Sequence, residues 1–449
     1  MNKREFLKTS CAVVSGGFLS RLGVAGSEQQ EKARTNWAGN YTYSTNNLHL
    51  PKSVADVQKV VKSCDKLKAL GARHSFNGIA DSTANQISLK QLDQMTLDKK
   101  ARTVTVEAGV TYGRLSPYLD ENGYAVHNLA SLPHVTVAGA CATGTHGSGI
   151  KNGNLSTAVS GLEMVTADGE LITLSREKDG ERFKGAVVGL GALGVVTKVT
   201  LDVQPTFMVS QVVYENLPLG QLEKHLDEIF SSGYSVSLFT DWQNHMATQV
   251  WIKRRIEPGA AIHWEPEFFG ATQATQKLHP LAGHSAENCT EQMGTPGPWY
   301  ERLPHFKMNF TPSSGAELQS EYFVPRERGY EAILAVERLR ESITPHLFIS
   351  ELRTIAADDL WMSEAYKRPS LAIHFTWKPE WPDVKKVLPM IEEQLAPFEA
   401  RPHWAKLFTM APGPLESKYE KLVEYRALVK EYDPRGKFRN AFLSTNVYG

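Results

Sequence analysis

The stretch ASLPHVTVAGACATGTHGSG, residues 130–149, decides the fold. Glycines, which permit positive φ and close backbone approach, alternate in it with hydroxyl side chains, at Gly139, Thr143, Gly144, Thr145, Gly147, Ser148 and Gly149. Successive exposed amides in such a loop bind anions. Because the stretch contains no lysine or arginine, we expect amides and hydroxyls to hold a phosphate-bearing ligand. Taken alone, the pattern is equally typical of an ordinary turn region.

A second loop, GARHSFNGIAD (residues 71–81), places His74 between Arg73 and Ser75. An isolated histidine in this setting is by default a surface residue or a hydrogen-bonded core residue. The loop therefore needs a wider context before His74 can be given a chemical role.

Bulk composition limits the classes of function. The chain has 449 residues, 41% hydrophobic and 22% charged, with a formal net charge of zero. These values predict two or three folded domains and argue against disorder. No excess of basic residues indicates a nucleic acid or an anionic membrane surface as partner. A small neutral molecule fits, although neutrality supports this only weakly.

The N-terminus has the pattern of a secretory signal, predicted over residues 1–26. MNKREFLK supplies positive charge, and a short, weakly apolar run with small residues follows it. Lys3 stands where a twin-arginine signal has its first arginine, which leaves the export route open. We expect an exported protein, periplasmic or secreted, cleaved near Ala25 or Gly26, with loss of Cys11. A frayed or anchoring N-terminus is the alternative.

The remaining cysteines are Cys64, Cys141 and Cys289. Three widely spaced cysteines allow at most one disulfide. The sequence has neither a CxxC pair nor an HExxH motif, so we expect no metal site.

The pattern of the chain changes near Pro205. Before it, short strands alternate with a few helices. VADVQKVVKSCDKL (residues 54–67) has helical spacing, and LEMVTADGELITLS (162–175) predicts a hairpin at Asp168-Gly169. Longer strands and amphipathic helices follow. We predict domains over residues 27–204 and 205–399, and a C-terminal segment over 400–449.

GLGALG, residues 189–194, matches the glycine spacing of a dinucleotide-binding fingerprint but lacks the sequence context that the fingerprint requires. The fingerprint requires a helix to begin at the glycines, with an acidic residue about 20 positions on. The alternating, β-branched run VVTKVTLDV follows instead and predicts a strand. We interpret GLGALG as a turn between strands.

Together, the two loops resemble the vanillyl-alcohol-oxidase family of flavoproteins, most closely its sugar-alcohol branch, the alditol oxidases. The resemblance runs from TNWAGNYTYS (35–44) to GKFRNAF (436–442). It includes YSVSLFTDW, GPWYERLPHF, TPSSGAELQSEY, ELRTIAADDLW, HFTW and RPHWAK. It implies an α+β protein with an FAD-binding fold of two subdomains and an α+β substrate (cap) domain.

The same resemblance implies FAD bound covalently through His74. A neutral imidazole nitrogen is a competent nucleophile toward the flavin 8α carbon. Many relatives have glycine where this chain has Arg73. Ala130 falls next to the carbon that oxygen attacks, where a small side chain favours an oxidase. The implied cofactor-binding residues are Arg73, His74, Ser75, Phe76, Asn77, Ala130, Ser131, Thr136, Gly139, Gly144, Thr145, His146, Gly147, Ser148 and Val196.

The substrate residues are expected in the second half. Glu351 and Arg353 alternate and share one strand face, as do His374 and Thr376. Alone, each pair is more typical of a solvated face or a surface ion pair. The resemblance places them in a polyol pocket with Lys406 and Ser131.

The roles follow from the reaction. Arg353 and Lys406 hold the reacting hydroxyl and stabilise the anionic reduced flavin. His374 is the expected general base. Glu351 orients Arg353, and Thr376 and Ser131 supply further hydrogen bonds.

The predicted function is oxidation of the terminal hydroxyl of an alditol, such as xylitol or sorbitol, to the aldose, with reduction of oxygen to hydrogen peroxide. The alternatives are a sugar-1,4-lactone oxidase or dehydrogenase and a flavin-carrying binding protein without turnover. Polyol and molecular oxygen are the expected partners, with no nucleic acid and no membrane span after signal removal. A monomer is compatible with the sequence.

Overall fold

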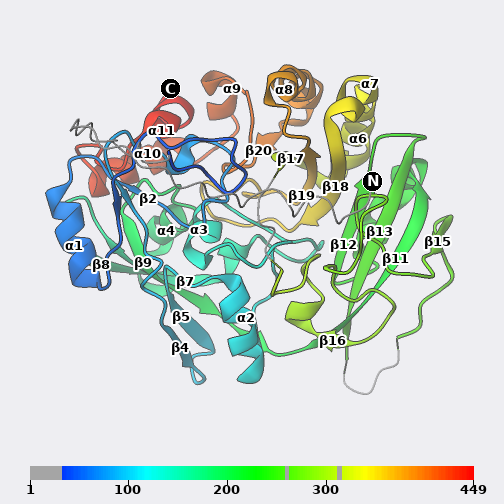
Figure 1. Cartoon of the computed structure of the whole chain (residues 1–449), viewed down its shortest axis with the longest axis horizontal. Helices are drawn as coiled ribbons and strands as arrows, with labels where there is room; N and C mark the ends of the chain where they lie inside the picture. Colours follow the sequence, from blue (N-terminus) through cyan, green and yellow to red (C-terminus); the bar gives the residue numbers. More distant parts are fainter. Residues whose placement is uncertain (1–32, 258–261, 311–315) are drawn as a thin grey trace, which may run out of the picture. The chain divides into compact units, whose positions relative to one another are not determined.

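The computed structural model describes residues 33–257, 262–310 and 316–449 (Figure 1). Ala33–Gly449 form one compact unit. The signal predicted over residues 1–26 lies outside the described residues, and the domain boundaries near 204 and 399 stay predictions. None of the helices in the described ranges combines the length and the apolar character needed to cross a membrane.

A five-stranded antiparallel sheet organises the first part of the chain (Figure 1). Its β9 alternates buried and partly exposed residues, as a strand covered on one face must. The Asp168-Gly169 turn joins β7 and β8, and Gly169 has a φ of +80°. The hairpin and the strand after GLGALG are therefore confirmed. The strand order is β4 (Met95–Asp98), β5 (Thr103–Glu107), β9 (Val195–Asp202), β7 (Val159–Val165) and β8 (Leu171–Ser175).

Short elements surround this sheet. Helix α1 begins after Ser53, whose side chain accepts a hydrogen bond from the amide of Asp56. Two small sheets pair β1 (Leu48–His49) with β3 (Gln86–Ile87) and β2 (Lys68–Ala69), and β6 (Tyr124–Ala125) with β10 (Gln204–Pro205). The helices are α1 (Val54–Ser63), α2 (Tyr112–Glu121), α3 (Val137–Ala142) and α4 (Arg176–Val187).

Helix α3 lies inside the glycine-rich stretch that the sequence analysis treats as a loop. Thr136 caps the helix by accepting a hydrogen bond from the amide of Gly139. The small residues of AGACA tolerate a helical turn next to other backbone, and this local packing outweighs the loop signal of the glycines.

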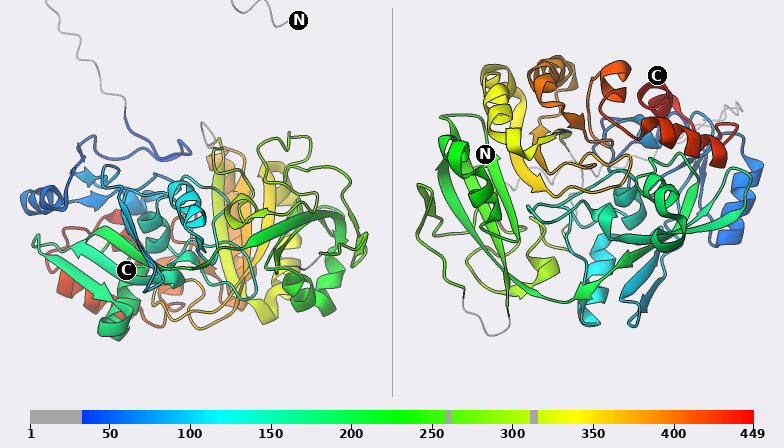
Figure 2. Two further views of the ribbon diagram at one scale, coloured as in Figure 1. Left: turned by 90° about the horizontal axis from the view of Figure 1, so that it is seen from below. Right: turned by 180° about the vertical axis from the view of Figure 1, so that it is seen from behind.

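A ten-stranded sheet dominates the second part (Figures 1 and 2). Helices α5 (Leu222–Ser231), α6 (Gly329–Glu337) and α8 (Trp381–Leu395) pack over one face, with α7 (Arg340–Ile343) beside them. The strand order is β14 (Glu267–Phe268), β15 (Ala271–Gln273), β11 (Met208–Pro218), β13 (Met246–Ile256), β12 (Ser235–Thr240), β18 (Leu347–Ile355), β19 (Ser370–Trp377), β17 (Leu318–Pro325) and β20 (Arg401–Pro402), with β16 (Gly297–Pro298) on β11.

The register of this sheet creates a polar row on the face that the helices leave open. Glu351 on β18 lies opposite His374 on β19, and His374 lies opposite Glu321 on β17. Residues opposite one another in antiparallel strands point to the same side. Three ionisable side chains from three strands therefore share one line across the sheet.

The C-terminal segment packs back on the N-terminal half. Helix α10 (Leu422–Tyr432) contacts α4, and α11 (Ala441–Asn446) contacts α9 (Pro412–Glu416). The Asn440 amide donates to the carbonyls of Gly78, Ile79 and Asp81. Chain segments more than 300 residues apart are thus joined by hydrogen bonds to backbone.

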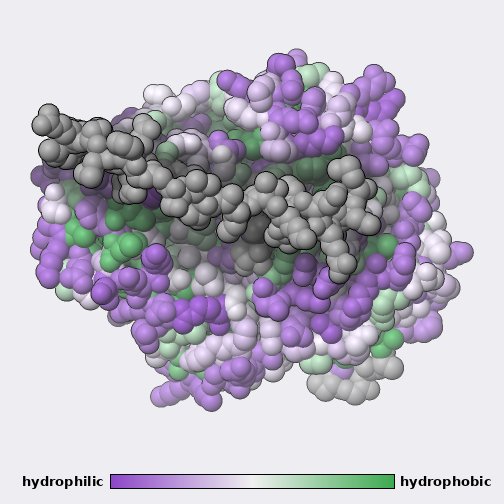
Figure 3. Space-filling model, viewed as in Figure 1, coloured by the Kyte–Doolittle hydropathy of each residue, from purple (hydrophilic) through white to green (hydrophobic). Residues whose placement is uncertain are grey.

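The structure confirms the α+β fold class. Cys64, Cys141 and Cys289 are all free and buried, so the one disulfide that the sequence permits does not form. Hydrophilic side chains dominate the face shown in Figure 3, with smaller groups of hydrophobic side chains between them.

Candidate active site

A cavity of about 530 Å³ lies between the N-terminal loops and the open face of the large sheet. Its lining combines two sets of residues, which we name separately. The cofactor-side wall includes residues of 71–76, residues of 130–146 with helix α3, and Val196. The substrate-side wall is formed by Glu321, Glu351, Arg353, His374 and Lys406.

Most of the predicted cofactor residues line this cavity. They are Arg73, His74, Ser75, Phe76, Ala130, Ser131, Thr136, Gly139, Thr145, His146 and Val196. The GLGALG turn also reaches the wall, where the buried Lys68 ammonium donates to the carbonyls of Leu190 and Gly191. The prediction of a turn between two strands is wrong, because these residues connect helix α4 to β9, and they also form part of the cavity.

Four predicted cofactor residues lie behind the wall. Asn77 donates to the carbonyls of Trp404 and Lys406, and Ser148 donates to the carbonyl of Val236. Gly144 has a φ of +67°, and a Cβ there would clash with the carboxyl of Glu364. A Cβ on Gly147 would clash with the carbonyl of Leu129. The structure gives these four residues packing and anchoring contacts, and their predicted contact with FAD stays a prediction.

His74 is held by aromatic neighbours. Its ring centroid lies 4.5 Å from that of Trp37, and its Nδ1 lies 3.2 Å from Nε2 of His134. Desolvation in the cavity wall, and secondarily His134 and Lys406, lower the pKa of His74 to about 3. The imidazole is therefore neutral near pH 7, the state in which a ring nitrogen has a free lone pair.

Arg73 adopts the backbone conformation that favours glycine. Its φ is +62°, in the left-handed region that side chains with a Cβ rarely adopt. The Arg73 carbonyl accepts a hydrogen bond from the amide of Trp37, and its guanidinium donates to the carbonyl of Thr35. These two contacts hold the chain in this conformation beside His74.

The substrate-side wall brings together the charged residues predicted from the sequence. Nζ of Lys406 lies 2.9 Å from Nδ1 of His374, and Nε2 of His374 lies 3.1 Å from Oγ1 of Thr376. Because an ammonium can only donate, Nδ1 of His374 is an acceptor and Nε2 carries the proton. Burial first, and then Lys406, lower the pKa of His374 well below its usual value.

Glu351 has a different main partner from the one expected. Its Oε1 lies 2.8 Å from Nε2 of His305 and 3.6 Å from Nε of Arg353. Burial alone would raise the pKa of Glu351, but Arg353 and His305 outweigh it and keep the carboxyl ionised. Glu351 and Arg353 are two residues apart on one strand and extend side by side. The Arg353 guanidinium can therefore lie closer to a carboxylate on another strand than to the carboxylate of Glu351.

That residue is Glu321, which the sequence analysis missed. Its Oε1 accepts from Nη2 of Arg353 at 2.9 Å, and its Oε2 accepts from Nζ of Lys406 at 2.6 Å. The alternation of Gln319 and Glu321 on one strand was the available signal, since the pair Glu351 and Arg353 shows the same spacing. His305 and His403, which also line the cavity, carried no such pattern.

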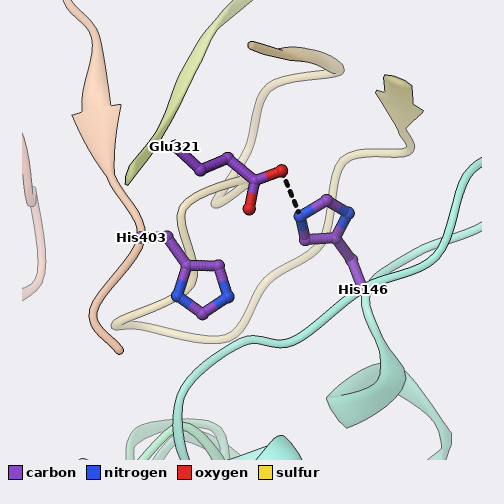
Figure 4. A group of neighbouring side chains, drawn as sticks. All are labelled: His146, Glu321 and His403. Atoms are coloured by element: carbon purple, nitrogen blue, oxygen red, sulfur yellow. Dashed lines mark ion pairs between the residues drawn. The ribbon is translucent and has the colours of Figure 1, made fainter. Parts of the chain in front are cut away.

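Glu321 also forms a cluster with two histidines (Figure 4). One ligand atom each of His146, Glu321 and His403 lie within 4.8 Å of one another, a spacing compatible with a metal ion. However, both carboxylate oxygens of Glu321 already accept hydrogen bonds from cationic side chains. Two cations beside the cluster oppose a divalent ion by Coulomb repulsion, so the donor set favours an ion-pair network.

Comparison with known proteins agrees with this geometry. Residues 47–175 match the FAD binding domain family, and residues 313–446 match the D-arabinono-1,4-lactone oxidase family. Alditol oxidase of Streptomyces sp. (strain IKD472 / FERM P-14339) is 47% identical, over 92% of this chain and 98% of that protein. L-gulonolactone oxidase of Mus musculus is 28% identical over the same shares of the two chains.

Solved structures show the same fold. Cholesterol oxidase from B. sterolicum has a TM-score of 0.72 at 15% identity, covering 93% of this chain and 96% of that one. Glucooligosaccharide oxidase from Acremonium strictum, which has a 6-S-cysteinyl, 8α-N1-histidyl FAD, has a TM-score of 0.71 at 14% identity, covering 92% and 94%. At this identity the likeness concerns the fold alone.

A cavity between an FAD-binding part and a sheet that presents buried ionisable groups defines an FAD-dependent oxidoreductase, acting on CH–OH groups with oxygen as acceptor. Within that class, the chain belongs to the alditol oxidase family.

Proposed function

We propose that the protein oxidises the terminal primary hydroxyl of alditols such as xylitol and sorbitol to the aldose, while oxygen is reduced to hydrogen peroxide. The observation that carries the proposal is the substrate-side wall, where a neutral histidine lies between carboxylates and beside two cations. A polyol offers only hydroxyl groups, and this wall supplies both donors and acceptors for them.

FAD fits the cofactor-side wall. The neutral imidazole of His74 lines the cavity. A Cβ on Gly139 would lie 2.8 Å from Oγ1 of Thr136, so the backbone there has no room for a side chain. FAD bound here would supply the redox chemistry, as acceptor of the hydride from the alcohol carbon and donor of the electrons to oxygen. We propose that His74 forms the covalent bond to FAD, as the 8α-histidyl FAD of glucooligosaccharide oxidase suggests by analogy.

The protein residues bind and deprotonate the alcohol. A hydroxyl placed between Lys406 and His374 accepts a hydrogen bond from Nζ and donates its own to Nδ1. Arg353 and Lys406 stabilise the negative charge that develops on the oxygen. His374 takes the proton, because its lone pair is free once the hydroxyl replaces the lysine contact. Ser131 and Thr376 line the same cavity and bind further hydroxyls.

The test is a peroxide-coupled screen of the purified protein with alditols and aldono-1,4-lactones. We expect turnover with xylitol and sorbitol and little with lactones. The match of residues 313–446 to the D-arabinono-1,4-lactone oxidase family favours lactones as the second candidate substrates. The L-gulonolactone oxidase of Mus musculus, however, is only 28% identical to this chain. Faster turnover with a lactone than with any alditol would overturn the proposal. No turnover, with a flavin spectrum that no substrate changes, would indicate a binding protein.

Acid precipitation tests the tether, since covalently bound flavin stays yellow in the pellet. For the N-terminus, we propose export and cleavage near residue 26, on the strength of the MNKREFLK pattern. Mature protein from the native host should begin near residue 27 outside the cytoplasm. An intact Met1 in the cytoplasmic fraction would contradict this.

A further inference from the structure

Glu321 is the most connected ionisable group among the described residues of the cavity. Its side chain is fully buried. Charged or titratable side chains surround its carboxylate. They come from β18, from β19, from the segments that follow α3 and β20, and from residue 364. They are Arg353 at 2.9 Å, Lys406 at 2.6 Å, His146 at 3.3 Å and His374 at 3.9 Å, with His403 in the same cluster and Glu364 further off.

The charges of the substrate-side wall balance. Burial would raise the pKa of Glu321, but Lys406, His146 and Arg353 hold it well below its usual range. The two carboxylates Glu321 and Glu351 thus oppose two cations, Arg353 and Lys406. A buried charge without a partner is costly, so each cation depends on a carboxylate to remain charged in the cavity.

We propose that Glu321 is a positioning residue for alcohol oxidation, which fixes Arg353 and Lys406 around the reacting hydroxyl and sets the protonation of the Lys406–His374 pair. The inference rests on the proposed function, which supplies the reaction. It assigns to Glu321 the orienting role that the sequence analysis assigned to Glu351.

The geometry supports the orienting part. Each oxygen of the carboxylate binds one cation, Oε1 the guanidinium and Oε2 the ammonium. A carboxylate on a rigid strand therefore sets the separation of the two groups that hold the alkoxide. Small displacements of such groups reduce the rate strongly.

The charge supports the second part. When His374 accepts the alcohol proton, an imidazolium forms near the Lys406 ammonium, which contacts His374 directly before the hydroxyl binds. Repulsion between the two cations opposes this step, and the carboxylates in the same row offset it. Removal of the Glu321 charge lowers the pKa of both His374 and Lys406, because each protonated form loses a nearby anion.

The main experiment measures flavin reduction by xylitol in anaerobic stopped flow, as a function of pH. The acid limb reports protonation of His374, and the alkaline limb reports deprotonation of Lys406. In Glu321→Gln we expect both limbs to move to lower pH by about one unit or more, with a lower maximal rate. If neither limb of the pH profile moves in Glu321→Gln, the proposed role of the Glu321 charge is wrong.

Glu321→Asp separates position from charge. The shorter side chain keeps the anion but cannot reach both cations at hydrogen-bond distance. We expect limbs at the wild-type pH and a maximal rate lower by about tenfold. A wild-type rate in this variant would overturn the positioning role, including in the case that Glu321→Gln does not fold.

Glu392→Gln is the matched control. Glu392 is a partly buried carboxyl beside β17, which accepts a hydrogen bond from Tyr322 on the opposite face of the strand and lies outside the cavity lining. It should lower the melting temperature without moving either limb. Equal shifts of the limbs in Glu392→Gln and Glu321→Gln would mean that general loosening of β17 moves them, and would overturn the proposal.

Sulfite binding to the oxidised flavin gives a readout without turnover. Sulfite is an anion, so loss of one negative charge from the cavity should tighten its binding to Glu321→Gln by roughly threefold or more, and Glu321→Asp should match the wild type. Unchanged binding to Glu321→Gln would contradict the charge role. If no alditol reduces the wild-type flavin, the proposed function fails, whereas the sulfite measurement still decides the charge role of Glu321.

Discussion

The two walls of the cavity bind their ligands by different means. The cofactor-side wall is built mainly from backbone, small residues and neutral rings, and the predicted residues in it, apart from Val196, lie within two short stretches of sequence. The substrate-side wall is built from three buried charges, the partly buried Lys406 and a histidine. They come from β17, β18, β19 and the segment after β20. One wall therefore depends on local backbone conformation, and the other on long-range register and charge balance.

The difference predicts where substitutions matter most. On the substrate-side wall, each side chain acts on the charge that develops in the reaction, so single replacements should change rates by orders of magnitude. On the cofactor-side wall, replacements should change attachment and stability more than the rate. The following predictions run from the largest expected effect to the smallest.

Replacement of His374 by glutamine removes the base but keeps a hydrogen-bonding side chain of similar size. The rate of flavin reduction by xylitol should fall by about 100- to 10,000-fold, while the FAD spectrum stays intact. Anaerobic stopped flow at saturating xylitol measures this. A rate within about tenfold of the wild type would assign the base to another group.

Replacement of Lys406 by methionine keeps an apolar stem and deletes the ammonium. Flavin reduction should slow by about 100- to 1,000-fold, the cost of one preorganised donor, with kcat and kcat/KM lowered together. If reduction proceeds at the wild-type rate and only reoxidation by oxygen slows, Lys406 belongs to the oxygen reaction.

The wild-type pH profile should place the acid limb below about pH 6.5, the usual pKa of histidine. The base must be neutral to accept a proton, and the pKa of His374 lies well below its usual value because of burial and Lys406. As the pH falls through that usual value, kcat/KM should therefore stay level. It should fall about tenfold per pH unit only below the lowered pKa. A limb at or above the usual value would mean that a less buried group titrates.

Replacement of His74 by alanine tests the cofactor-side wall. All acid-stable flavin should be lost, so that FAD appears in the supernatant after acid precipitation. Alcohol oxidation should continue in protein reloaded with FAD, because the substrate-side wall is unchanged. Acid-stable flavin in this variant would place the covalent bond elsewhere.

The smallest effect should come from Arg73. Arg73→Gly and Arg73→Ala both remove the guanidinium bond to the Thr35 carbonyl, but only alanine keeps a Cβ at a φ of +62°. Glycine should therefore be the more stable of the two by roughly 1 kcal/mol, as measured by urea unfolding, with covalent flavin retained in both. Equal stability would show that the left-handed conformation relaxes without cost.

The sequence predicted the cofactor-side wall more completely than the substrate-side wall, because one depends on local sequence and the other on long-range strand register. The loop around His74 and the stretch 130–149 are contiguous, so their residue pattern is visible in one line of text. Strand alternation also placed Glu351 with Arg353 and His374 with Thr376 on shared faces. The same alternation was available for Gln319 and Glu321, but it could not identify the partners of Glu321, because Lys406 is 85 residues away and their contact depends on the pairing of β17 with β19 and β20.

Local conformation set the other limit. Nothing in GARHSFNGIAD required Arg73 to adopt positive φ, since this follows from the contacts with Trp37 and Thr35. Likewise, the anchoring positions of Gly144 and Ser148 depend on Glu364 and Val236, which lie in distant segments.

The bond from Asn77 to the carbonyl of Lys406 also has a consequence for biosynthesis. A ribosome makes the His74 loop early and Lys406 only near the end of the chain. A product truncated before residue 406 can contain the loop proposed to hold the flavin, but it lacks the ammonium proposed to act on the alcohol. If both residues act as proposed, peroxide production from the alcohol requires nearly the whole polypeptide.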